Sequence, residues 1–109
     1  MLEVNNNKLS VAEEKVAKEA LQKACKREIS TLMMNVRDRA SSLNKIEDLW
    51  DLHDLLSTKR YEIDGKYAYN SSSLVFDFAN LIKEKWLTFE DIQGLPSEML
   101  SKISALARM

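Results

Sequence analysis

The sequence predicts an all-α protein, built as a long antiparallel helical hairpin, the stalk, with a small three-helix head. Of its 109 residues, 45% are hydrophobic and 30% are charged, and only two glycines and one proline interrupt the chain. This composition is typical of helical proteins with few turns. A chain of this length forms one domain with a modest core. We expect a single domain with a flexible leader at residues 1–10, the stalk at 11–63 and the head at 74–109.

The first predicted helix begins after Ser10, because Ser10 and Glu13 have the spacing of a capping box. Its apolar residues recur every three or four positions: Ala17, Leu21, Cys25, Ile29, Leu32 and Val36. The pattern continues to Ser41, which predicts a helix of about 30 residues and roughly 45 Å. A rod of that length is too long for this chain to cover alone. It either bends over the rest of the chain or pairs with another molecule, and we favour pairing.

The second predicted helix spans residues 45–63, between a start signal at Asn44 and Glu47 and a stop at Gly65. The short link to the first helix favours an antiparallel hairpin. Leu49, Leu52 and Leu56 then face the apolar stripe of the first helix, or its copy in a partner. Residues 66–73, which include a run of serines, form a loop.

The head begins with a helix at 74–86, which we extend to Trp86 because Lys85 stands where a terminating glycine is expected. Its inward-facing residues are Leu74, Phe78, Leu81, Ile82 and Trp86, and Phe76 lies outside that set. A short fourth helix starts at Thr88 and stops at Gly94. A fifth has Pro96 in its first turn. Its stripe consists of Met99, Leu100, Ile103 and Leu106.

One face of the second helix carries side chains that favour protein contacts. At about 100° per residue, a third of the circumference holds Trp50, His53, Asp54, Ser57, Arg60 and Tyr61. Aromatic residues and arginine are enriched at protein interfaces. Trp50 and Arg60 could instead cover the edge of the helix pair, with the arginine stem lying over apolar surface. From the residues alone, both interpretations stay open.

His53 and Asp54 could suggest general-base catalysis. Adjacent residues of a helix, however, point about 100° apart and do not face each other. We therefore favour a histidine that forms a hydrogen bond across an interface, and we predict no catalytic residue. A metal or cofactor site is not expected either, because the only histidine lies almost thirty residues from the only cysteine, Cys25, which we expect to be a small buried residue.

Charge and hydropathy argue against two further classes of partner. The net charge of −1 provides no basic excess for nucleic acid, and no apolar stretch approaches the eighteen or so residues of a membrane span. Residues 1–10 are polar and lack the apolar core of a signal peptide. We expect a cytosolic protein.

The run from Asp48 to Tyr67 resembles the fluorescence recovery protein family of cyanobacteria. The matching residues are Asp48-Leu49-Trp50, His53-Asp54, Lys59-Arg60 and Glu62-Ile63-Asp64-Gly65-Lys66-Tyr67. The similarity continues at 76–79, at 81–84, at 101–103 and at 105–108, so it covers residues 11–109.

The resemblance implies a regulator rather than an enzyme. Such proteins bind the light-activated red form of the orange carotenoid protein through its C-terminal domain, speed its return to the orange form and help detach it from the phycobilisome, which ends non-photochemical quenching. By position, the implied partner-binding residues are Trp50, His53, Asp54, Arg60, Phe76 and Lys102. A phenylalanine is by default a core residue, and a lysine is by default solvated.

The resemblance also implies a homodimer, with higher oligomers left open, and a cytoplasmic location that allows peripheral association with the thylakoid membrane. It places Leu49 at the dimer interface. The packing positions that we assign to the same interface are Leu52, Leu56, Leu32 and Val36. The alternative function is a generic helical dimeric scaffold or adaptor for another protein.

Overall fold

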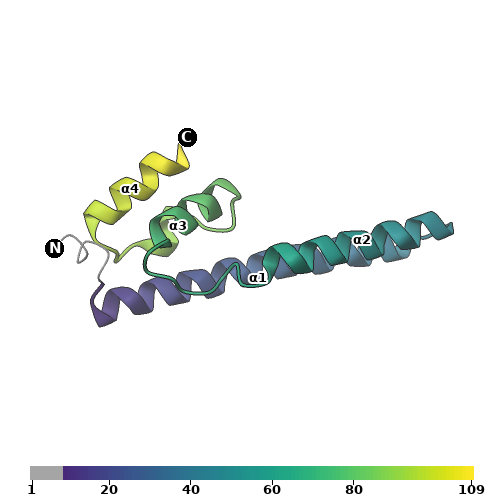
Figure 1. The fold of residues 1–109 in the computed structure, drawn as a ribbon, viewed down its shortest axis with the longest axis horizontal. Helices are drawn as coiled ribbons and strands as arrows, with labels where there is room; N and C mark the ends of the chain where they lie inside the picture. The colour runs from purple at the N-terminus through teal and green to yellow at the C-terminus, as the bar shows by residue number, and fades with distance from the viewer. Residues whose placement is uncertain (1–8) are drawn as a thin grey trace.

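The computed structural model describes residues 9–109 and is elongated, with extents of 59 × 27 × 26 Å (Figure 1). Its radius of gyration is 17.3 Å, against about 13 Å for a compact domain of this length. The cause is α1, which spans Val11–Ser41. At 1.5 Å per residue its 31 residues reach about 46 Å. The predicted all-α class is confirmed.

The start of α1 follows the prediction. The Ser10 hydroxyl accepts the amide hydrogen of Glu13 at 3.1 Å, and the Glu13 carboxylate accepts that of Ser10 at 2.9 Å. The helix ends where the two serines stand. Their hydroxyls donate to the carbonyls one turn earlier, Ser41 to Arg37 and Ser42 to Asp38. Serine hydroxyls that compete for backbone groups in this way favour a helix end.

The second stalk helix, α2, spans Ile46–Ile63 and returns along the second half of α1 (Figure 1). Its bounds agree with the prediction, but the capping residue does not. The carboxylate of Asp48 accepts the amide hydrogens of Asn44 at 3.0 Å and Lys45 at 3.3 Å. An aspartate in the first turn also complements the helix dipole, which explains why Asp48, and not Asn44, caps the helix. The chain then turns at Gly65, whose φ of +77° favours glycine.

The head consists of α3 (Leu74–Lys83), a 3₁₀ helix η2 (Phe89–Ile92) and α4 (Ser97–Ala107). The extension of the third helix to Trp86 was wrong, because Lys85 itself adopts the left-handed conformation, with φ of 71°. The amide of Trp86 donates to the carbonyl of Leu81 at 2.9 Å, and that of Lys85 to Ile82 at 3.0 Å. These two bonds form a Schellman motif with lysine in the glycine position.

The connection from η2 to α4 is shaped by Gly94. Its φ is +107°, and a Cβ atom there would lie 3.2 Å from a methyl group of Val16 on α1. Glycine therefore lets this turn lie directly against α1. The fourth helix was expected before Gly94 and is a single 3₁₀ turn, capped by Thr88. Pro96 precedes the last helix instead of standing in its first turn.

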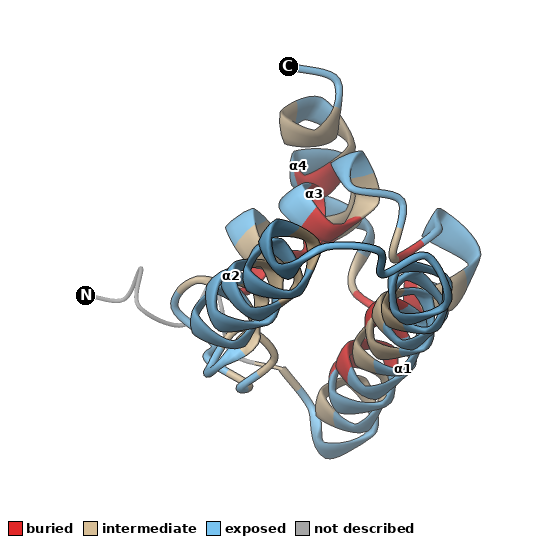
Figure 2. Cartoon of the chain, turned by 90° about the vertical axis from the view of Figure 1, so that its right-hand side faces the viewer, coloured by how far each residue is buried: buried red, intermediate tan, exposed pale blue. Residues whose placement is uncertain are grey.

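The core lies between the head and the first half of α1, as the red segments of Figure 2 show. Alanines on α1 let the head approach its backbone closely. The buried apolar residues are Ala17, Ala20, Leu21, Ala24, Leu74, Phe78, Ala79, Leu81, Leu87, Ile92, Leu95, Met99 and Ile103. The sequence did not predict that the head covers this half of α1. Cys25 was expected to be buried and is only half-buried, at the margin of that contact.

An ion pair fixes η2 to α1. The guanidinium of Arg27 donates to both carboxylate oxygens of Asp91, at 2.6 and 3.2 Å, and to the carbonyl of Trp86 at 2.9 Å. The hydrogen bond from Arg27 holds the pKa of Asp91 well below its usual range.

A second polar cluster joins α1, the loop after α2 and the end of α3. The buried carboxylate of Glu28 accepts the hydroxyl hydrogen of Tyr67 and an ammonium hydrogen of Lys66 at 2.9 Å. Lys66 also donates to Glu84 at 2.8 Å. Burial by itself would raise the pKa of Glu28, but the bonds from Tyr67 and Lys66 outweigh it and lower that pKa. The cluster ties the head to the stalk.

Candidate protein-binding surface

The predicted contact face of α2 is open to water. No residue of α2 is buried. Trp50 is 56% exposed and Tyr61 86%, and His53, Asp54 and Arg60 are exposed as well. Large exposed aromatic side chains that share one helical face with an arginine match the composition of interface centres. We call this face the α2 stripe; it consists of Trp50, His53, Asp54, Ser57, Arg60 and Tyr61.

His53 and Asp54 contact each other, contrary to the expectation that they would not. Nδ1 of His53 lies 3.3 Å from Oδ1 of Asp54. The reason is that both side chains extend outward into solvent, 72% and 78% exposed, where their rotamers are free to converge. Such exposure leaves no enclosed site for a reacting substrate. Among residues 9–109, no three His, Cys, Asp or Glu side chains form a group that could hold a metal ion.

The residues assigned to the dimer interface also remain uncovered in the protomer. Leu49 and Leu56 are exposed, and Leu52, Leu32 and Val36 are only partly buried. An apolar groove of ≈ 410 Å³ runs between α1 and α2. It is lined by Ile29, Leu32, Leu56, Lys59, Arg60, Ile63 and Asp64. Arg60 therefore borders both the groove and the α2 stripe, so the two surfaces are continuous.

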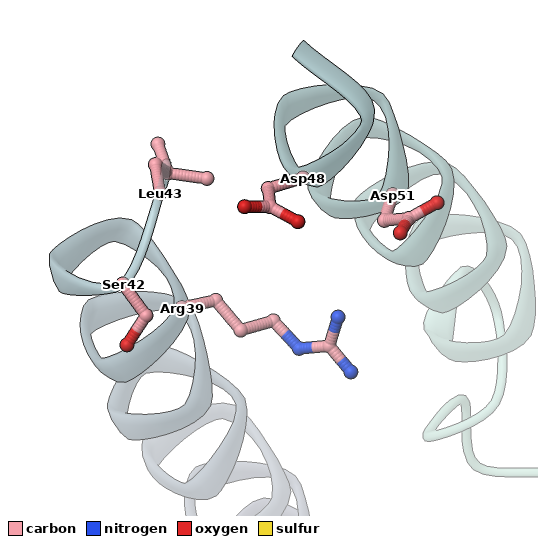
Figure 3. A pocket seen from close by; sticks show the side chains of 5 residues that line it. All are labelled: Arg39, Ser42, Leu43, Asp48 and Asp51. Atoms are coloured by element: carbon pink, nitrogen blue, oxygen red, sulfur yellow. The ribbon is translucent and has the colours of Figure 1, made fainter. Parts of the chain in front are cut away.

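A smaller depression of ≈ 150 Å³ lies at the tip of the stalk, where α1 meets α2 (Figure 3). The side chain of Arg39 extends from α1 toward the side where α2 presents Asp48 and Asp51. Ser42 and Leu43 complete its lining. No local sequence pattern predicts this depression, because its charged residues come from two helices whose register depends on the turn between them.

The two head residues implied by the resemblance lie on different helices. Phe76 is 63% exposed on α3, which agrees with its place outside the inward-facing set. Lys102 is exposed on α4. A head groove of ≈ 220 Å³ between these helices is lined by Phe76, Ala79, Asn80, Lys83, Leu106 and Met109. Lys102 precedes Leu106 by one helical turn, so both share one side of α4. The α2 stripe and the head residues therefore form two separate surfaces.

The structure tests one further expectation, the lack of a membrane span. Among the described helices, none combines the length and the apolar character that crossing a bilayer requires.

Comparisons with known proteins agree with one another. Residues 9–107 match the family described as photoprotection regulator fluorescence recovery protein. The chain is 43% identical to the fluorescence recovery protein of Synechocystis sp. (strain ATCC 27184 / PCC 6803 / Kazusa) over 109 residues, which cover 100% of both proteins.

Solved structures share the fold. The fluorescence recovery protein of Fremyella diplosiphon has a TM-score of 0.86 and 52% identity, over 92% of this chain and 98% of that one. The structure from Synechocystis sp. PCC 6803 has a TM-score of 0.88 and 44% identity, over 93% and 99%.

Proposed function

Since this chain belongs to the fluorescence recovery protein family of photoprotection regulators, we propose that it binds the light-activated red form of the orange carotenoid protein. The α2 stripe is the proposed contact, and the C-terminal domain of the carotenoid protein is the proposed target. Binding speeds the return to the orange form and helps detach the carotenoid protein from the phycobilisome. No covalent chemistry is required, and the protein acts in the cytoplasm.

The observation that carries this proposal is the exposure of the α2 stripe. Trp50, His53, Asp54 and Arg60 are all accessible on one helix that buries none of its residues. A helix gains most of its stability in water by burying an apolar face. A helix with no buried residue that also presents an indole and a guanidinium is therefore suited to contact another macromolecule.

The proposed mechanism has two parts, selection of the red form and acceleration of its return. Tighter binding of the red form alone would only stabilise that form. Acceleration therefore requires the protein to bind the two domains more tightly as they approach each other than when they are apart. In the orange form the docking face of the carotenoid protein is covered, and light activation exposes it. If the α2 stripe holds one domain while the head holds the other, the two domains meet at a raised effective concentration. The barrier to their rejoining is then lower.

We also propose a homodimer that forms through the stalk. The accessible surface of the chain is 7694 Å², against roughly 6,200 Å² for a compact monomer of this mass. Several large apolar side chains of the stalk are exposed, among them Met33, Ile46, Leu49 and Leu56. A second stalk that packs against these residues would remove that apolar surface from water.

Recovery of the orange form, followed by absorbance in the dark after strong light, tests the proposal. The protein should accelerate recovery, and it should co-purify with lit but not with dark carotenoid protein. Trp50→Leu and Arg60→Leu should each slow recovery and weaken binding about 30-fold, the effect of removing a central interface residue worth about 2 kcal/mol.

A matched control is Arg37→Leu, which removes an exposed arginine of α1 outside the α2 stripe. It should behave like the unmodified protein. Unchanged recovery in both stripe variants at equal protein concentration would contradict the proposed contact. Binding to many cytoplasmic proteins, with no preference for the lit form, would instead support a general scaffold.

A further inference from the structure

A buried charge cluster joins the head to the end of α2. Glu28 is 5% exposed and is the only buried charged residue in the part of the chain that the structure describes. Lys66 and Tyr67 donate to it from the loop that follows α2, and Lys66 also donates to Glu84 at the end of α3. We call these four residues the Glu28 cluster. Tyr61, the last residue of the α2 stripe, precedes Lys66 by only five residues, so the cluster links the head closely to the stripe.

The apolar contact between the head and α1 is poorly directional. On α1 its buried residues are one leucine and three alanines with short side chains, Ala17, Ala20, Leu21 and Ala24. Apolar burial depends on the area removed from water and not on direction, whereas a hydrogen bond weakens steeply as its angle changes. The bonds of Glu28 are therefore better suited than the alanines to fix the orientation of the head.

Stability alone does not account for a buried carboxylate here. Removing charges from water is costly, and apolar residues of similar size often stabilise a fold equally well. A satisfied buried network does restrict how the segments that carry it are arranged. The ion pair of Arg27 and Asp91 joins the head to α1 but does not include the exit of α2.

We propose that the Glu28 cluster positions the head at a fixed orientation relative to the α2 stripe, so that both surfaces contact the carotenoid protein at once. This inference rests on the proposed function and deepens it, because it names the residues that set the geometry between the two contacts. Burial, together with the bond to Glu28, raises the pKa of Tyr67, so its hydroxyl keeps its proton and donates. A head that is free to turn would hold the second domain at a lower effective concentration. Recovery would then be slower at saturation, while the affinity for the red form would stay nearly unchanged.

Removing the cluster without unfolding the junction provides the test. Glu28→Met combined with Tyr67→Phe keeps the apolar volume, and Lys66 retains its bond to Glu84, so stability should change little. Recovery of the orange form, measured over a range of protein concentrations, should reach a maximal rate about tenfold lower, with the half-maximal concentration unchanged within about twofold. A loss of folded protein would instead raise the half-maximal concentration and leave the maximal rate intact. Tyr67→Phe alone, with a smaller effect of the same kind, keeps the test usable if the double variant does not fold.

Glu28→Gln provides the rescue. Tyr67 and Lys66 donate to the same oxygen of Glu28, Oε1, so the carbonyl oxygen of a glutamine accepts both bonds. This variant should keep the maximal rate within about threefold. The matched control is Tyr69→Phe, which removes a hydroxyl from the same loop outside the cluster and should behave like the unmodified protein.

The orientation of the head is measured by the distance between spin labels at two exposed positions, Ser101→Cys on α4 and Arg37→Cys on α1, in a Cys25→Ser background diluted with unlabelled chains. The unmodified junction should give a narrow distance distribution, and Glu28→Met with Tyr67→Phe a broader one. A narrow distribution in the double variant, or a broad one with an unchanged maximal rate, would overturn the inference. Absence of acceleration by the unmodified protein would contradict the proposed function itself. The distance measurement separates the two failures, because it requires no carotenoid protein.

Discussion

The two halves of α1 differ in what covers them. The N-terminal part, residues 11–28, contacts the head and contains all the buried residues of this helix, from Ala17 to Glu28; together with the head it makes up the covered half. The C-terminal part, residues 29–41, runs beside α2, and together they make up the uncovered half, in which no residue is buried. The helix has one regular apolar stripe along both halves, so the difference does not come from helix formation. The difference arises because other segments of the same chain pack against only one half of the helix. The apolar surface of the other half is therefore available to other molecules.

The largest effect should come from a charge in the uncovered half, which disrupts the proposed dimer. Leu49→Glu places a carboxylate on the apolar side of the stalk, and a symmetric pair contains this site twice. The cost of burying two unpaired charges, about 5 kcal/mol in total, should convert the dimer to a monomer. Light scattering or sedimentation measures the change, with Leu49→Met as the conservative control. A dimer that persists in the glutamate variant would remove Leu49 from the interface.

The matching change in the covered half is Phe78→Ala. Phe78 is fully buried between the head and α1, and its truncation should lower the free energy of unfolding by about 4 kcal/mol at any protein concentration. Denaturant titration followed by circular dichroism provides the measurement. Phe78→Leu, expected to cost about 1.5 kcal/mol, keeps the test usable if the alanine variant does not fold.

Leu56→Ala in the uncovered half is the comparison for Phe78→Ala. Its effect should depend on protein concentration, because it acts through association. A concentration-independent loss for Leu56→Ala, as large as that for Phe78→Ala, would mean that both halves are stabilised within one chain.

Low pH should also affect the two halves differently, because it removes stability contributed by carboxylates of the covered half. The pKa values of Asp91 and Glu28 are lowered by their partners in the head junction. The stability they contribute is therefore present above their unfolded pKa values of about 4 and is lost as the pH falls below that range. The melting temperature should stay level from pH 7 to about 5 and decline below about 4.

Asp91→Asn should reduce the part of the stability that is lost in acid. It should lower the free energy of unfolding at pH 7 by roughly 1 kcal/mol, a modest value because the side chain of Arg27 is 43% exposed. Asp51→Asn, an exposed carboxylate on α2, should leave the pH profile unchanged. An identical acid decline in Asp91→Asn and the unmodified protein would show that this ion pair is not responsible.

The smallest predicted effect concerns one residue of the head. Lys85 adopts a left-handed conformation that costs a non-glycine residue about 1 kcal/mol, so Lys85→Gly should raise the stability of the head by about that amount. Lys83→Gly, two residues earlier inside α3, should have the opposite sign because glycine destabilises a helix. Thermal melting of the two variants checks both signs. A lower melting temperature for Lys85→Gly would contradict the explanation for the end of α3.

Much of the candidate site could be predicted from the sequence, because helical periodicity determines which residues share a face of α2. The α2 stripe needs only the 100° rotation between residues. The position of Phe76 outside the inward-facing set of its helix left both burial and exposure open, and the structure shows that it is exposed. The head groove was not predictable in the same way. Lys83 and Leu106 meet across it only because α3 and α4 pack together, and no local pattern encodes that contact.

The sequence by itself determined where the two stalk helices, α1 and α2, begin and end and which of their residues share a face. These features depend on caps and periodicity, which act over a few neighbouring residues. Only the tertiary structure decided that the head covers the N-terminal part of α1 and that Glu28 is buried among Tyr67 and Lys66. Both depend on close packing or hydrogen bonding between segments far apart in the chain, and such complementarity appears only when the segments meet.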